Sequence, residues 1–185
     1  TTGRPRAAIL STAALVASVE AWLAILPPAT GWLLALGLGH IAGLGVAWRA
    51  ALSGVPLVVL PQSDAAGILA ALAGDPAPSH VSLVPAMLAR LLDAVGDGPP
   101  PATLRAALVG GGPIAPDLVR WYMALGLEMF EVWGQTESCG AVTSNITGKV
   151  KPRAADAVNP KLPTGEIEVV ASAFSLETMA ETLPF

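Results

Sequence analysis

The stretch SHVSLVPAMLARLLDAVG, residues 79–96, joins two kinds of secondary structure across a single proline. Its first part contains Val81, Leu83 and Val84 in a short apolar run, which predicts a strand. Pro85 suits the first turn of a helix, where a missing N–H costs nothing. The stretch therefore predicts a strand that leads directly into a helix.

The same alternation runs through most of the chain. Apolar strand-like runs are separated by helical segments of roughly 10 to 15 residues, and strands that are apolar throughout indicate a parallel sheet covered on both faces. The predicted fold class is therefore α/β, a doubly wound, mostly parallel sheet with helices on both faces. The expected helices are residues 11–26, 40–54, 63–74, 85–96 and 115–126, and the expected strands are residues 31–39, 55–61, 79–84, 104–112 and 127–134.

The regular alternation fades toward the C-terminal end. We place the α/β unit at residues 1–143. Residues 144–185 are polar and interrupted by prolines, so we expect an irregular tail there with one further strand at about residues 165–171.

The composition brings a membrane protein into consideration, because 53% of the residues are hydrophobic and only 13% are charged. Residues 21–48 contain no Asp, Glu, Lys or Arg, a length sufficient to cross a bilayer of about 30 Å. Pro27 and Pro28, followed by Thr30 and Gly31, divide this stretch. We therefore favour two buried segments without a membrane span, and a membrane-embedded segment is the less favoured alternative.

Charge and cysteine content limit the partners and the compartment. The net charge is −4, the sequence pI is about 5.0, and the ten basic residues are dispersed. No basic surface for a phosphate backbone is expected, so we expect no nucleic-acid partner. Cys139 is the single cysteine, which excludes an intrachain disulfide and fits a reducing, cytoplasmic setting.

Glycines and polar residues gather at the predicted carboxyl ends of the strands. These places are residues 37–40, Pro85, residues 110–113 and residues 133–137. In open parallel sheets ligands bind just beyond these ends, and glycine allows a ligand to approach the backbone closely. We therefore expect these places to face one common small molecule.

Two of the segments carry groups that suit a nucleotide. In WGQTE, residues 133–137, Trp133 can stack on a base, Thr136 can donate to a phosphate oxygen and Glu137 can hold Mg²⁺. TTGRPR, residues 1–6, supplies two hydroxyls, a glycine and two cations, which suits a phosphate-holding loop. It does not have the Walker A pattern.

Together these segments resemble the AMP-forming acyl-CoA synthetases of the adenylate-forming superfamily. TTGRPR resembles the end of the family's phosphate loop, GHIAGLG its histidine motif, and VPAMLARLL the segment after that motif. LRAALVGGGPIAPDLV resembles the glycine segment beside the adenine, and VWGQTE the aromatic-Gly-x-Thr-Glu motif. The five segments follow the family's order and cover roughly residues 1–143, with GEIEVV as a weaker match beyond. WLLALGLGHIAGLG is similar to the o-succinylbenzoate-CoA ligase branch in particular.

The resemblance implies a reaction and its ligands. A small-molecule carboxylic acid would attack the α-phosphate of ATP, pyrophosphate would leave, and coenzyme A would take the acyl group, with Mg²⁺ beside the phosphates. It implies catalytic roles for three residues: His40 would line the acyl pocket, Thr136 would contact the α-phosphate and Glu137 would bind Mg²⁺. The residues implied for nucleotide binding are Thr1, Thr2, Gly3, Arg6, Gly110, Gly111, Gly112, Trp133, Gly134, Gln135 and Thr136.

The sequence also departs from the family pattern. Arg6 stands where the phosphate loop usually has lysine, and Trp133 stands where the family usually has tyrosine. The family's ribose-binding aspartate, its hinge and the lysine of its small C-terminal domain are not found. We therefore expect residues 1–143 to be the nucleotide- and acyl-binding subdomain of an incomplete enzyme segment that is weakly active or inactive by itself.

Each site residue also has a structural interpretation. His40 could be a hydrogen-bonded buried histidine, Gly110–Gly112 a tight turn, Trp133 a core residue and Glu137 a carboxylate at a helix start. The alternative for the whole chain is a non-catalytic module that binds nucleotide or acyl-adenylate. Neither the acid nor the oligomeric state follows from these motifs.

Overall fold

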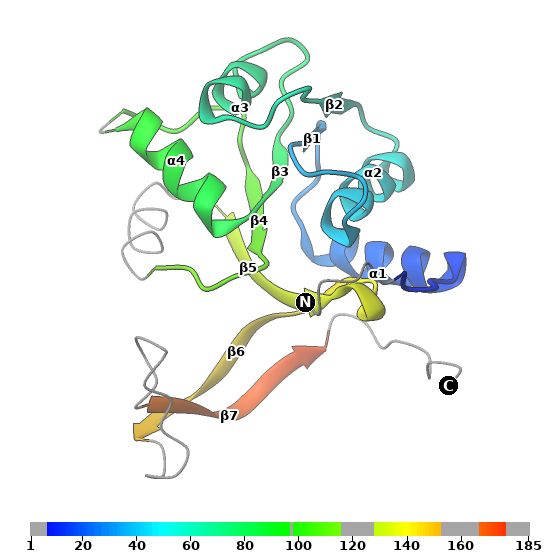
Figure 1. Ribbon diagram of the computed structural model, residues 1–185, viewed down its shortest axis with the longest axis vertical. Coiled ribbons are helices and arrows are strands. Elements are labelled where there is room, and N and C mark those ends of the chain that lie inside the picture. Colours follow the sequence, from blue (N-terminus) through cyan, green and yellow to red (C-terminus); the bar gives the residue numbers. More distant parts are fainter. Residues whose placement is uncertain (1–6, 97, 116–127, 153–166, 177–185) are drawn as a thin grey trace.

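The computed structural model describes residues 7–96, 98–115, 128–152 and 167–176 (Figure 1). In these ranges seven strands form one sheet in the order β2-β1-β3-β4-β5-β6-β7. The strands from β2 to β5 pair in parallel, whereas β6 pairs antiparallel with both β5 and β7. The strands are β1 (Trp32–Leu34), β2 (Leu57–Val59), β3 (His80–Leu83), β4 (Ala106–Gly110), β5 (Glu128–Gln135), β6 (Gly140–Pro152) and β7 (Ile167–Leu176).

Each described helix has a local signal at one of its ends. In α1 (Thr12–Ile25) the Ser11 hydroxyl accepts a hydrogen bond from the Ala14 N–H at 3.1 Å. In α3 (Ala65–Leu72) Asp64 caps the helix by accepting from the Gly67 N–H at 2.7 Å. α2 (Ile41–Ser53) ends at Gly54 in the left-handed conformation, and α4 (Pro85–Val95) has its proline in the first turn.

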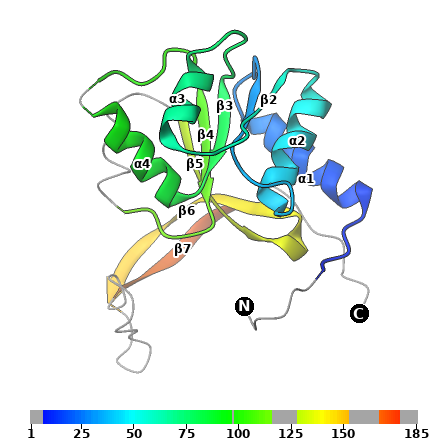
Figure 2. The same cartoon turned by 45° about the horizontal axis from the view of Figure 1, so that its top comes forward.

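The helices cover the parallel strands on both faces (Figures 1 and 2). α1 and α2 lie on one face, where they pack on a core that includes Trp32, Leu34, Ala106 and Leu108. α3 and α4 lie on the other face, over a second core. Successive strand residues alternate between the two cores, because a strand points its side chains to opposite faces. The predicted fold class, a doubly wound and mostly parallel α/β sheet, is confirmed.

The expectation of an irregular segment after residue 143 is wrong for residues 144–152. These residues belong to β6, which begins at Gly140 and runs to Pro152. Threonine, valine and isoleucine recur along this segment, and such β-branched residues favour an extended strand even among polar neighbours. The further strand expected at about residues 165–171 is β7, which spans Ile167–Leu176. The placement of a boundary at residue 143 stays a prediction.

Several other expectations fall outside the described ranges. The helix predicted at residues 115–126 lies almost wholly there, as do residues 1–6, 153–166 and 177–185. The apolar stretch 21–48 is divided between the end of α1, the short strand β1 and the start of α2. Among the described helices, none combines the length and the apolar character that a membrane crossing requires.

Candidate functional site

A cavity of about 160 Å³ lies between the sheet and the helices α1 and α2. It is placed at the carboxyl ends of β3, β4 and β5, and the loop after β1 closes one side. Its walls are mostly apolar. The lining residues are Leu15, Ser18, Val19, Leu36, Ile41, Ala42, Gly45, Arg49, Ser82, Leu83, Val84, Leu108, Gly110, Gly111, Val132, Gly134, Cys139, Gly140 and Ala141.

One wall of the cavity is backbone, because glycines let three strands come close together. A Cβ on Gly110 would lie 2.5 Å from both the carbonyl oxygen and Cγ2 of Val132 on the neighbouring strand. A Cβ on Gly134 would overlap the carbonyl of Gly140 across the β5–β6 pair. Gly111 has a φ of 84°, which a residue with a side chain rarely adopts. Glycine backbone therefore forms part of this wall, next to Val132, Cys139 and Ala141.

Helix α1 holds the start of β6 beside the cavity. The Ser18 hydroxyl donates to the Cys139 carbonyl at 3.2 Å, and the Trp22 indole N–H donates to the Ala141 carbonyl at 3.0 Å. Cys139 itself has a φ of 60° and a free thiol, and burial raises the pKa of that thiol. The thiol is therefore protonated at neutral pH and a weak nucleophile.

Two polar residues, Arg49 and Ser82, line the part of the cavity farther from the strand ends. Ser82 on β3 pairs in register with Leu108 on β4. Gly110, which pairs with Val132, comes two residues after Leu108 and is therefore nearer the carboxyl end of β4. Arg49 follows Ile41 by eight residues, about 12 Å back along α2 from the strand ends. Arg49 and Ser82 therefore line the cavity farther from the carboxyl ends of the strands than Gly110 and Gly111 do.

Arg49 is a buried cation, and two of its three nitrogens lack a hydrogen-bond partner in the described part of the chain. Its side chain is 7% exposed, and neither Nε nor Nη1 has a hydrogen-bond partner among the described residues; the buried Ser82 hydroxyl lacks one in the same ranges. Burial lowers the pKa of Arg49 well below its ordinary value, to about 10. The guanidinium is thus charged at neutral pH although water is largely excluded from it.

The guanidinium of Arg49 has two close neighbours, the Trp32 ring and the backbone of Gly45. Its Cζ lies 5.3 Å from the ring centroid of Trp32, and a Cβ on Gly45, one helical turn earlier, would lie 3.5 Å from Nη2. The Trp32 ring in turn lies 4.9 Å from the ring of His80. Sequence reasoning missed Arg49, although one signal was present, since it is the only charged residue in an apolar helix.

The structure brings only some of the predicted site residues to this cavity. Gly110, Gly111 and Gly134 line it, together with the residues next to His40 and Pro85. His40 itself is exposed at the start of α2 and makes no capping hydrogen bond through its side chain. Gly112 lies against Pro85 at the end of β4, with its missing Cβ 3.8 Å from the proline ring.

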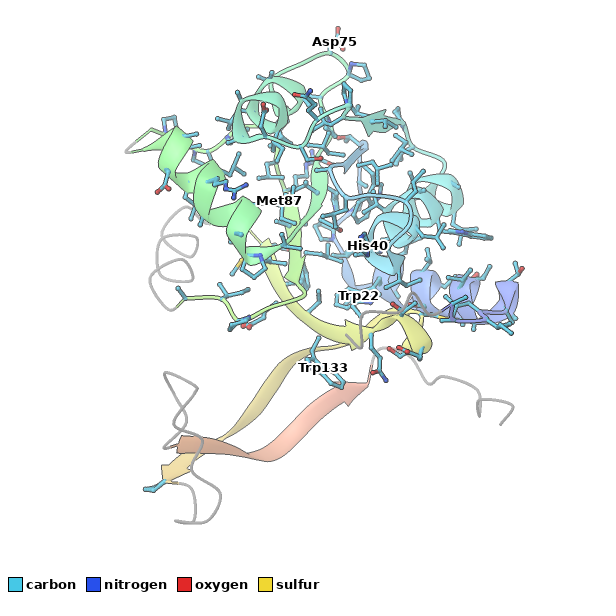
Figure 3. All side chains as sticks on the ribbon, in the orientation of Figure 1. Trp22, His40, Asp75, Met87 and Trp133 are labelled. Carbon is cyan, nitrogen blue, oxygen red and sulfur yellow. The ribbon has the colours of Figure 1, made fainter. Side chains whose placement is uncertain are left out.

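The aromatic-Gly-x-Thr-Glu motif lies beside the cavity on exposed backbone. Trp133 is 68% exposed, and Figure 3 shows it on the opposite side of β5 from Trp22. Thr136 and Glu137 form an exposed 3₁₀ turn, which Gln135 and Ser138 close by reciprocal hydrogen bonds. Thr1, Thr2, Gly3 and Arg6 lie outside the described residues. The roles expected for all these residues stay predictions.

The start of α2 is fixed by backbone packing. A Cβ on Gly43 would overlap the carbonyl oxygen of Gly37, the loop residue that follows β1. Helix and loop therefore touch backbone to backbone, which places Ile41 and Ala42 against the cavity.

An apolar cavity with a glycine wall beyond the carboxyl ends of parallel strands is typical of α/β proteins that bind a small ligand at the edge of the sheet. The model of the family "AMP-binding enzyme" matches residues 1–175, and the chain belongs to this family. A curated relative is the 2-succinylbenzoate–CoA ligase of Salmonella typhimurium, 32% identical over 171 residues, which are 91% of this chain and 34% of the relative.

Solved structures of similar proteins share the fold. The o-succinylbenzoate CoA synthetase of Bacillus subtilis, solved with the acyl-adenylate OSB-AMP and with ATP and magnesium, has a TM-score of 0.68 at 26% identity, over 78% of this chain and 30% of that one. The corresponding Escherichia coli protein, with a bound analogue of OSB-AMS, has a TM-score of 0.66 at 29% identity, over 83% and 36%. The chain spans about a third of the length of these relatives.

Proposed function

We propose that the protein is an AMP-forming acid–CoA ligase whose acid is an aromatic dicarboxylate such as 2-succinylbenzoate. The observation that carries this proposal is Arg49, a buried cation that lines a mostly apolar cavity and whose Nε and Nη1 have no hydrogen-bond partner among the described residues. The names of the relatives point to the same acid.

The cavity fits a substituted benzene ring in size and chemistry. An apolar cavity of about 150 Å³ is large enough to bind benzene, and this one has about 160 Å³. A guanidinium is a favourable partner for a carboxylate, because the hydrogen bond between them is charge-assisted. A ring with one carboxylate at Arg49 would leave a second carboxylate free to extend toward the glycine wall.

The second carboxylate would be the group that reacts. Its oxygen would attack the α-phosphate of ATP and pyrophosphate would leave; the thiol of coenzyme A would then attack the acyl carbonyl, and AMP would leave. We place the nucleotide along Gly110–Gly112 and residues 133–137, with Trp133 as the stacking surface, and the triphosphate at residues 1–6. His40, at the start of α2, would face the acyl group.

The metal site is proposed on the same segment. Thr136 and Glu137 offer adjacent hydroxyl and carboxylate oxygens on an exposed turn, the donor type that Mg²⁺ prefers when it also binds phosphate. Mg²⁺ bound there would neutralise charge on the phosphates. We place the reaction in the cytoplasm, which the single free thiol of Cys139 supports.

The test compares two acids in the complete protein by ATP-dependent pyrophosphate release. One acid is 2-succinylbenzoate and the other is the same molecule without its ring carboxylate. We expect Arg49→Met to lower kcat/KM for the dicarboxylate at least 30-fold, because truncating one side of a buried ion pair costs about 2 to 5 kcal/mol. The monocarboxylate should change less than 3-fold.

Two further variants complete the comparison. Glu137→Ala should raise the KM for Mg²⁺-ATP with both acids, whereas Arg90→Met, on the exposed side of α4, should change nothing. Equal losses with the two acids in Arg49→Met would contradict the assignment of the acid. Unchanged Mg²⁺-ATP kinetics in Glu137→Ala would contradict the assignment of the metal site.

A further inference from the structure

We propose that Trp32 is a positioning residue: its ring holds the guanidinium of Arg49 at the inner end of the cavity and so sets the preference for an acid with a second carboxylate. This inference rests on the proposed function, since it assigns Arg49 to the substrate.

The arginine needs an external support. A long side chain has many rotamers, and ordering it costs conformational entropy. In the described residues neither Nε nor Nη1 is held by a hydrogen bond. The guanidinium does contact the Trp32 ring, whose centroid lies 5.3 Å from Cζ, within the range of a cation–π interaction.

The Trp32 ring is itself immobile because its surroundings are fully packed. Trp32 is 0% exposed and lies in the core beneath α1 and α2. Its partner in the parallel β1–β3 register is His80, whose ring lies 4.9 Å away. The Nδ1 of His80 is 2.9 Å from the Ser79 hydroxyl oxygen, which accepts from the Thr30 N–H at 2.8 Å. The stack is therefore tied to the backbone of the loop before β1.

The stack also keeps a second cation away from the arginine. Burial lowers the pKa of His80, the cations Arg105 and Arg49 act in the same direction, and the backbone at Pro27 and Ser79 opposes them. The His80 ring is consequently neutral at pH 7. Arg49 thus lies beside a neutral aromatic stack and the bare backbone of Gly45, with Nε and Nη1 buried and without a hydrogen-bond partner among the described residues.

The experiment measures the KM of the complete protein for 2-succinylbenzoate, for the analogue without the ring carboxylate, and for ATP. We expect Trp32→Leu to raise the KM for the dicarboxylate about 10-fold and to leave the other two within 3-fold. Trp32→Phe, which keeps an aromatic face, should raise it only about 2- to 4-fold. In Trp32→Leu/Arg49→Met the ratio between the two acids should equal that of Arg49→Met alone.

Leu33→Ala is the matched control, because Leu33 is equally buried in the same strand but faces the other core. It should leave the ratio between the acids unchanged. The inference would be overturned if Trp32→Leu raised the KM for both acids and for ATP by the same factor. It would also be overturned if the ratio of the KM values for the two acids stayed unchanged in both Trp32 variants. If Trp32→Leu does not fold, the ratio measured in Trp32→Phe decides. If Arg49→Met also fails to separate the two acids, the proposed function fails as well; if it separates them, only the role of Trp32 is lost.

Discussion

Replacing Arg49 by methionine should make the ligand-free protein more stable, although it removes a buried contact. The guanidinium is a desolvated cation whose Nε and Nη1 have no partner in the described ranges. Removing an uncompensated buried charge and filling its place with an apolar side chain of similar length is stabilising in general. The same change should abolish recognition of the dicarboxylate.

The size of the effect follows from the burial of the side chain. A pKa lowered to about 10 corresponds to about 3 kcal/mol of unfavourable free energy for the charged form. The interaction with the Trp32 ring returns about 1 to 2 kcal/mol. We therefore expect Arg49→Met to raise the free energy of unfolding by about 1 to 2 kcal/mol.

The assay is equilibrium unfolding in urea with and without 2-succinylbenzoate. The ligand should raise the midpoint of the wild type and leave that of Arg49→Met in place, because only binding to the folded state stabilises a protein. Arg90→Met, at an exposed position, serves as the control. A loss of stability in the ligand-free Arg49→Met variant would refute the reasoning, since it would mean that the guanidinium is already compensated.

Two further predictions concern stability. Gly110→Ala should lower the free energy of unfolding by more than about 2 kcal/mol, because the added Cβ meets the Val132 backbone at 2.5 Å, whereas Gly39→Ala, with nothing within 4 Å, should be neutral in the same urea titration. The pKa of His80 is lowered on folding, so below pH 6.5 the unfolded chain binds a proton more readily than the folded protein does. The contribution of His80 to the free energy of unfolding should therefore be complete above pH 6.5 and decrease as the pH falls below it. His80→Gln should flatten this part of the pH profile; an unchanged profile would show that His80 is protonated without cost.

The α/β architecture could be predicted because strong local signals agree with the packing. Pro85 begins α4, and Asp64 caps α3. β6 could not be predicted in the same way. Its pairing with β5 and β7 satisfies a polar, proline-containing segment that has little apolar periodicity of its own.

The candidate site was predictable only in part. The rule that ligands bind at strand ends led to Gly110, Gly111 and Gly134. Arg49 escaped it, because its Cα lies on a helix well behind the strand ends and the direction of a single arginine is set by tertiary packing. Ser82 could not be predicted for a similar reason: the sequence around a serine in a strand does not show whether its hydroxyl will find a hydrogen-bond partner in the fold.

The backbone contact between Gly43 and the Gly37 carbonyl has a consequence for how such a pocket can diverge. A Cβ at position 43 would overlap the backbone of residues 36 and 37, so the spacing of loop and helix at this point is set by backbone atoms. Positions 41 and 42 can therefore exchange residues and change the shape of the cavity while the helix and the loop keep their spacing at Gly43. Selection for a new acid can therefore change the residues that line the cavity while the fold stays the same. In a scan of all substitutions, we expect position 43 to accept only glycine.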